Sequence, residues 1–116
     1  MKTFYERLME QRKIQASVQE HINEAAPESR RALLLIHARN MHEEYPHYEG
    51  HWDNWQVGRM PQRVVTKSGV AFEKGDWVLY DPNTPQMLDG RNRTIVAYSV
   101  RNNVDTSTGL YRLETN

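Results

Sequence analysis

The sequence predicts an α+β protein, in which an N-terminal two-helix hairpin packs on a small C-terminal antiparallel β-sheet or barrel. Apolar residues recur at helical spacing up to residue 45, and short β-like runs separated by turn residues follow Pro61. The chain of 116 residues is long enough for one core without disulfide or metal staples. We expect residues 1–45 to form the hairpin, 46–62 a connecting loop and 63–116 the sheet or barrel, all as one compact unit.

The first helix is expected over residues 3–22, which no glycine or proline interrupts. Its apolar positions are Phe4, Leu8, Ile14, Val18 and Ile22. After a break, Pro27 suits the first turn of a second helix, because the N–H that proline lacks is not needed there. Pro46 ends this second helix after Tyr45.

The second helix contains the apolar run Leu33–Ile36, which at about 100° per residue covers every face of one turn. A turn that is apolar all round must be covered on several sides. We therefore expect it to lie between the first helix and the sheet, or in a contact between two copies of the chain. Self-association through Leu33–Ile36 is one of the partner interactions that the sequence predicts.

Five short runs in the second half have the composition of strands, and they are residues 63–66, 70–73, 76–80, 94–100 and 110–114. Tight turns are expected at Gly69 and Gly75, and longer loops over residues 81–92 and 101–109. So many short strands favour a strongly bent sheet or a small barrel, which leaves few open edges. The segment Gly69-Val-Ala-Phe-Glu-Lys-Gly-Asp-Trp-Val-Leu-Tyr80 resembles the turn-and-strand unit of SH3-like barrels. The resemblance implies a fold only, because it carries no catalytic residues.

Bulk properties exclude several classes of protein. The formal net charge is zero, so no overall field attracts nucleic acid or an anionic membrane. Cysteine is absent, which excludes disulfides, thiolate catalysis and Cys-ligated metals. The longest apolar run, residues 32–36, is too short to span a bilayer, and the amino terminus lacks the apolar region of a signal peptide. We expect a soluble cytoplasmic protein with no cofactor and no membrane partner.

Residues 37–55 contain four of the five histidines and two of the three tryptophans. Within them, His42-Glu43-Glu44-Tyr45-Pro46-His47 is similar to the zinc-protease motif His-Glu-x-x-His but is one residue longer. The gap of five and the helix-ending Pro46 prevent the two histidines from sharing one helical face. A metal site built from loop residues remains an alternative, and its ligands would be His47, Glu49, His51 and Asp53. A general base such as His42 or His51 is the corresponding enzyme hypothesis.

Aromatic residues in the same segment predict a binding surface. Tyrosine and tryptophan dominate interface hot spots, and loops often carry recognition. The expected partner-binding residues are Tyr45, Tyr48, Trp52 and Trp55, together with Met87 and Leu88 in the loop that joins two strands. The alternative is that at least one tryptophan fills the junction between hairpin and sheet.

Basic residues in the second half allow a different hypothesis, single-stranded nucleic-acid binding, since small barrels stack bases on aromatics beside basic grooves. The basic residues of that hypothesis are Arg59, Arg63, Lys67, Arg91 and Arg93. The aromatic residues interleaved with them are more simply explained as core residues of alternating strands, and they are Phe72, Trp77, Tyr80, Tyr98 and Tyr111.

The function that the sequence favours is therefore a non-catalytic protein–protein interaction module, of the kind found among accessory proteins of phages or mobile elements, which act in the host cell. Single-stranded nucleic-acid binding is the first alternative, and a His/carboxylate metal-dependent enzyme is the second.

Overall fold

The computed structural model describes residues 3–44, 54–82 and 95–108. Two helices, α1 (Phe4–Glu24) and α2 (Pro27–Glu44), precede six short strands. The strands are β1 (Gln56–Arg59), β2 (Val64–Val65), β3 (Ala71–Phe72), β4 (Trp77–Tyr80), β5 (Ile95–Ser99) and β6 (Val104–Thr108). A four-stranded antiparallel sheet has the order β1-β4-β5-β6, and β2 pairs with β3 in a separate two-stranded sheet. The expected α+β arrangement of a helix pair on a small antiparallel sheet is confirmed, while the strands of these residues form no closed barrel.

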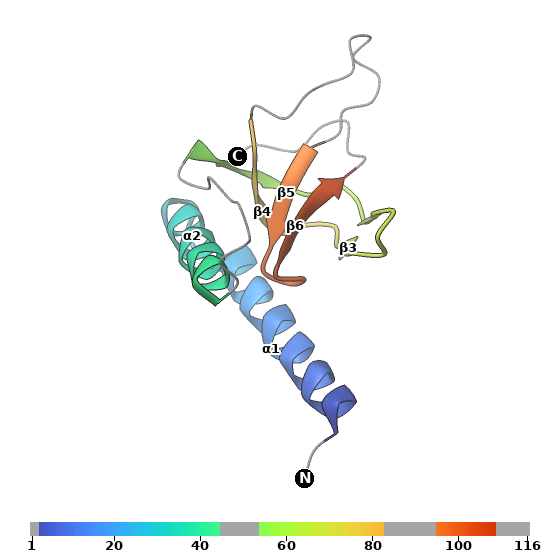
Figure 1. Cartoon of the computed structure of the whole chain (residues 1–116). Helices are drawn as coiled ribbons and strands as arrows, with labels where there is room; N and C mark the ends of the chain where they lie inside the picture. Colours follow the sequence, from blue (N-terminus) through green and yellow to red (C-terminus); the bar gives the residue numbers. More distant parts are fainter. Residues whose placement is uncertain (1–2, 45–53, 83–94, 109–116) are drawn as a thin grey trace.

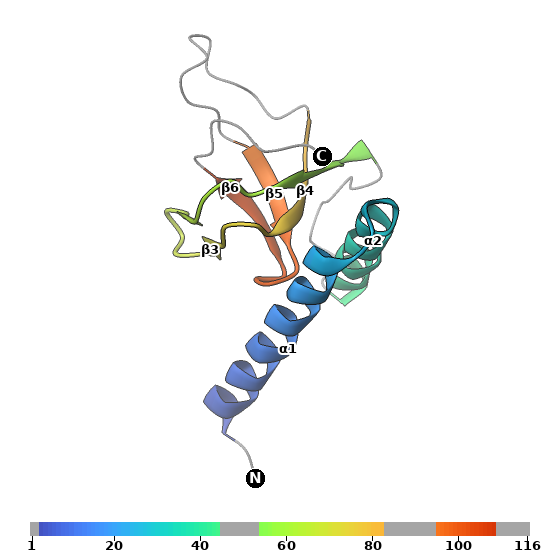
Figure 2. The ribbon, with the colours of Figure 1, turned by 180° about the vertical axis from the view of Figure 1, so that it is seen from behind.

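The two helices relate differently to the sheet. Figures 1 and 2 show that α2 and the C-terminal half of α1 lie beside the sheet, whereas the N-terminal half of α1 projects away from it. The longest dimension is accordingly 54 Å, against 32 and 28 Å for the other two. Thr3 caps α1 by accepting a hydrogen bond from the Glu6 backbone N–H at 3.1 Å, so the projecting end is a properly terminated helix.

The core lies between the helix pair and the sheet, and a smaller cluster lies under the β2–β3 hairpin. The larger cluster consists of Ile22, Leu34, Leu35, Ala38, Trp55, Trp77, Leu79, Tyr98 and Val100. The smaller one consists of Met60, Phe72, Val78 and Ala97. Within the apolar turn of α2, Leu34 and Leu35 are buried in the core and Leu33 packs against it, but Ile36 is exposed. Three of its four side chains therefore face the protein itself, and Ile36 alone is open to a second copy.

Two strands lie where the sequence predicted loops. β1 lies inside the expected connecting loop 46–62, and β6 lies inside the expected loop 101–109. Within the described residues, both are edge strands of the four-stranded sheet, and polar or glycine residues are tolerated at such edges. These two strands were not predicted because their residues are largely polar and do not alternate between apolar and polar. The last expected strand, 110–114, lies outside the described residues.

The turns are closer to expectation. Gly69 and Gly75 both have positive φ angles, 86° and 89°, as tight turns require. The turn between β5 and β6 is closed by Asn103, whose φ is 54° and whose N–H donates to the Ser99 carbonyl at 2.7 Å. The Tyr98 hydroxyl also donates to Asn103 Oδ1 at 2.7 Å. Asparagine tolerates this left-handed conformation better than other non-glycine residues do.

Candidate functional site

Most of the residues that the sequence singled out lie outside the residues that the structure describes. Those outside the described residues are Tyr45, Tyr48, Trp52, Met87 and Leu88 of the partner-binding set, His47, Glu49, His51 and Asp53 of the metal set, and Arg91 and Arg93 of the nucleic-acid set. Within the described ranges, no group of three or more His, Asp or Glu side chains is arranged to hold a metal ion. The same ranges contain no helix that is long and apolar enough to cross a membrane.

Trp55 is the one member of the predicted partner surface that the structure places, and it is buried in the larger core cluster. Its backbone carbonyl accepts a hydrogen bond from Arg31 Nε of α2 at 3.2 Å. Trp55 therefore fills the junction between the helix pair and the sheet. This corrects its assignment to the exposed aromatic patch and agrees with the alternative that a tryptophan occupies the junction.

The structure describes three of the basic residues of the nucleic-acid hypothesis, Arg59, Arg63 and Lys67. Arg63 forms an exposed ion pair with Glu73 at 3.0 Å, which balances its charge. The Arg59 guanidinium lies 6.0 Å from the centre of the Trp77 ring. Lys67 is exposed near the β2–β3 turn. The aromatics Phe72, Trp77 and Tyr98 are buried, so their faces are not open to bases.

A buried polar network attaches α1 to the sheet, and the sequence analysis missed it. Gln19 is completely buried. Its Nε2 donates to the Trp77 carbonyl at 2.8 Å and to Asn23 Oδ1 at 3.0 Å. Its Oε1 accepts from the Arg101 backbone N–H at 3.2 Å and from the Ser99 hydroxyl at 3.3 Å. A signal was present in the sequence, because Gln19 lies between Val18 and Ile22 on the apolar face of the helix.

Asp76 is the charged centre of this network. Its Oδ2 accepts from Arg101 Nε at 2.9 Å and from the Glu73 N–H at 3.3 Å, while its Oδ1 accepts from Arg101 Nη2 at 3.0 Å and from Asn23 Nδ2 at 3.1 Å. The hydrogen bonds that Arg101 donates to Asp76 raise the pKa of Arg101 above its ordinary value, although burial opposes this effect. Because both carboxylate oxygens are fully engaged, Asp76 is a structural group and not an available base.

The projecting half of α1 carries the most exposed apolar side chains of the described residues. Phe4 is 82% exposed and Tyr5 68%, and Met9 is also exposed. At 100° per residue, Phe4 lies on the same line along the helix as Ile22, and Leu8 lies about 40° from it. The face that packs on the sheet at Ile22 therefore continues beyond the sheet. We name the residues Phe4, Tyr5, Leu8 and Met9 the arm face.

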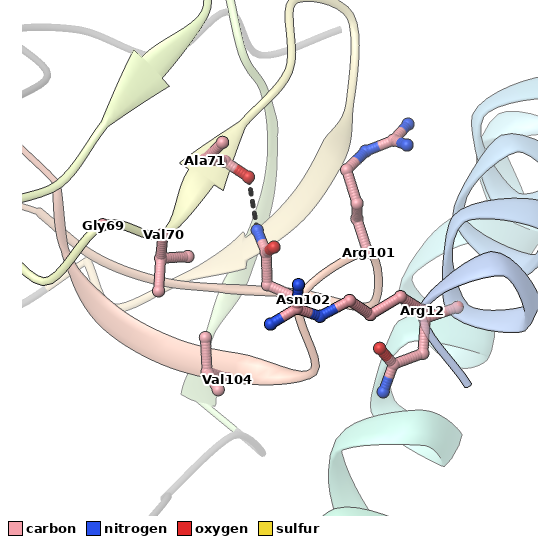
Figure 3. Close-up of a pocket in the computed structure, with 8 residues that line it drawn as sticks. Arg12, Gly69, Val70, Ala71, Arg101, Asn102 and Val104 are labelled. Atoms are coloured by element: carbon pink, nitrogen blue, oxygen red, sulfur yellow. Dashed lines mark hydrogen bonds between the residues drawn. The ribbon is translucent and has the colours of Figure 1, made fainter. Parts of the chain in front are cut away.

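A cavity of about 450 Å³ lies at the base of this arm (Figure 3). It is bounded by α1, by the β2–β3 turn and by the turn between β5 and β6, and its polar lining includes Arg12, Arg101 and Asn102. The sequence analysis did not anticipate it, because its walls come from three segments that are distant in the chain.

The fold and these surfaces describe a small α+β protein with a helical arm, which buried hydrogen bonds attach to the sheet, and a cavity at the base of that arm. Comparison of the chain with models of known families, with curated proteins and with solved structures gives no match.

Proposed function

We propose that the protein is a non-catalytic interaction module that binds another protein through the arm face of α1. The observation that carries this proposal is the exposure of two neighbouring aromatic side chains, Phe4 and Tyr5, on a helix that stands clear of its own sheet. Aromatic residues and methionine are enriched in the cores of protein interfaces. Leu8 and Met9, one turn later, complete a contiguous apolar patch.

The shape of the arm supports a mode in which a helix enters an apolar groove. Phe4 and Leu8, and Tyr5 and Met9, are i, i+4 pairs, so the four side chains cover about 140° of two successive turns and offer one broad side to a groove. The arm is also organised before binding, since Thr3 caps it and the bonds of Gln19 and Asn23 fix its direction. A partner then avoids most of the entropy cost of ordering it.

The charges beside the patch describe the partner's groove. Glu6 and Glu10 carry negative charge, and Arg7 carries positive charge, so the arm presents no field of a single sign. A groove with an apolar floor and a rim of mixed charge complements it. The predicted contacts at Tyr45, Tyr48, Trp52, Met87 and Leu88, and an accessory role in a phage or mobile element, remain predictions beside this proposal.

A matched set of variants tests the proposal. The double variant Phe4→Ser/Tyr5→Ser removes the aromatic anchors, and Ile14→Ser removes a comparably exposed apolar side chain (64%) that lies about 15 Å from Phe4 along the same helix. Circular dichroism checks that both are folded. Proteins retained from lysates of the source cells by the wild-type chain are identified, purified and mixed with each variant. We expect a one-to-one complex with wild type and Ile14→Ser, and none with the double variant.

Two outcomes contradict the proposal. A purified partner that binds the double variant as well as it binds wild type removes the arm face from the interface. A wild-type chain that is dimeric by light scattering, and becomes monomeric in the double variant, shows that the arm face is covered by a second copy instead of a different protein.

A further inference from the structure

The cavity at the base of the arm combines one unbalanced positive charge with apolar walls. Arg12 and Arg101 both line it, but they differ in their partners. Arg101 makes two hydrogen bonds to Asp76, so its charge is neutralised. Arg12 has no hydrogen bond or ion pair with the part of the chain that the structure describes. Figure 3 shows the Arg12 guanidinium extending toward Asn102, whereas that of Arg101 points away.

The opposite wall is held in place by Asn102. Its Nδ2 donates to the Ala71 carbonyl and so links the β5–β6 turn to β3. This bond fixes the amide plane and leaves Oδ1 without a donor from the described residues. Val70 and Val104 flank it and supply apolar surface. A charged donor, a neutral acceptor and two apolar side chains therefore line one space, together with the amide of Gln15 from α1.

The lining also limits the chemistry of the ligand. A volume of about 450 Å³ is in the range of small-molecule sites. Among the described residues, the lining contains no aromatic ring on which a nucleobase could stack. The described part of the lining also contains no His, Asp or Glu, the side chains that ordinarily bind metal ions. With one unbalanced guanidinium, it suits a single negative charge better than a polyphosphate.

We propose that this cavity binds a small organic carboxylate. The carboxylate pairs with the Arg12 guanidinium, the short apolar body of the ligand lies against Val70 and Val104, and a hydroxyl or amine of the ligand donates to Asn102 Oδ1. Arginine binds carboxylates in a planar, two-bond geometry, which makes it the orienting group of the site. This proposal does not depend on the interaction proposed for the arm face.

Amide NMR spectra of the full chain test the site. The probes are aliphatic and hydroxy-substituted carboxylates of four to eight carbons, each paired with its neutral amide and titrated to millimolar concentration. We expect at least one carboxylate to shift the amide signals of residues 69–71 and 101–104, and its amide to leave them unmoved. Arg12→Gln should weaken binding about tenfold or more, which corresponds to the loss of a charged hydrogen bond.

Lys13→Gln is the matched control, because it removes one positive charge from the next residue of the same helix without altering the cavity lining. It should bind the probe as wild type does, and so should Phe4→Ser/Tyr5→Ser. The proposal is overturned if no probe shifts these signals, or if Arg12→Gln and Lys13→Gln weaken binding equally. Tighter binding of a peptide with a free C-terminal carboxylate than of every small acid would also overturn it, because the ligand would then be a protein terminus.

Discussion

Replacing Arg101 by methionine should destabilise the protein strongly, because it leaves a buried carboxylate without its counter-charge. The side chain of Asp76 is 2% exposed and that of Arg101 is 22% exposed. Methionine preserves much of the apolar stem of arginine, so the variant removes mainly the guanidinium and its two hydrogen bonds to Asp76.

The size of the effect follows from these contacts. Hydrogen bonds to charged groups contribute about 1.5–3 kcal/mol each, and breaking a buried ion pair costs about 3–5 kcal/mol. Two considerations favour the low end of this range: Arg101 is partly hydrated, and Asp76 keeps the donors Asn23 Nδ2 and Glu73 N–H. We expect a loss of about 3 kcal/mol, a large part of the 5–15 kcal/mol typical of a domain.

Urea unfolding followed by tryptophan fluorescence measures this loss, since Trp55 and Trp77 are both in the core. Arg63→Met is the matched control, because the ion pair of Arg63 with Glu73 is similarly short, at 3.0 Å, but lies at the surface. The side chain of Arg63 is 59% exposed and that of Glu73 is 40% exposed. Such surface pairs contribute at most about 1 kcal/mol. A loss for Arg101→Met no larger than that for Arg63→Met would refute the view that the Asp76 network holds α1 on the sheet.

Three further changes test other parts of the structure. Burial lowers the pKa of His37 below its ordinary value of 6.5, so the unfolded chain takes up a proton more readily than the folded protein does. The free energy of unfolding should therefore fall as the pH drops below 6.5, and urea unfolding should show a smaller fall in His37→Gln. Leu34→Ala removes a fully buried side chain of α2 and should cost about 2–5 kcal/mol in the same assay, a result that a loosely packed helix pair would not give. Asn103→Ala places a β-carbon residue without a polar side chain at a positive φ and removes the acceptor of the Tyr98 hydroxyl, so it should lower the free energy of unfolding by about 2 kcal/mol in thermal unfolding. Asn103→Gly should lower it less, and equal losses in the two variants would count against backbone strain.

The helices and the class of fold were predictable because their signals are local. Prolines at 27 and 46 and the apolar period set both helices, and α2 indeed begins at Pro27. β1 and β6 were not predictable in this way, since edge strands are formed by backbone pairing with a neighbour and need no apolar alternation. The choice between sheet and barrel depended on pairings between distant strands, which a single sequence does not contain.

The candidate sites were harder to predict for the same reason. Gln19 and Asp76 are more than fifty residues apart in the chain, and neither suggests a buried network until α1 is packed on β4. The exposure of Phe4 was hidden too, because its spacing matches Ile22, which is buried. Whether the apolar face of α1 is buried along its whole length depends on how far the sheet extends beside the helix, and the spacing of apolar residues does not show that.

The affinity of the purified partner for the arm-face variants tests the central claim most directly. Two aromatic hot spots of at least about 2 kcal/mol each correspond to a loss of about a hundredfold or more. Isothermal titration calorimetry should therefore show that Phe4→Ser/Tyr5→Ser weakens binding to this extent, while Ile14→Ser changes the affinity less than about threefold. Equal affinities for the wild-type chain and the double variant, or a larger loss in Ile14→Ser, would contradict the proposal that α1 binds its partner through the arm face.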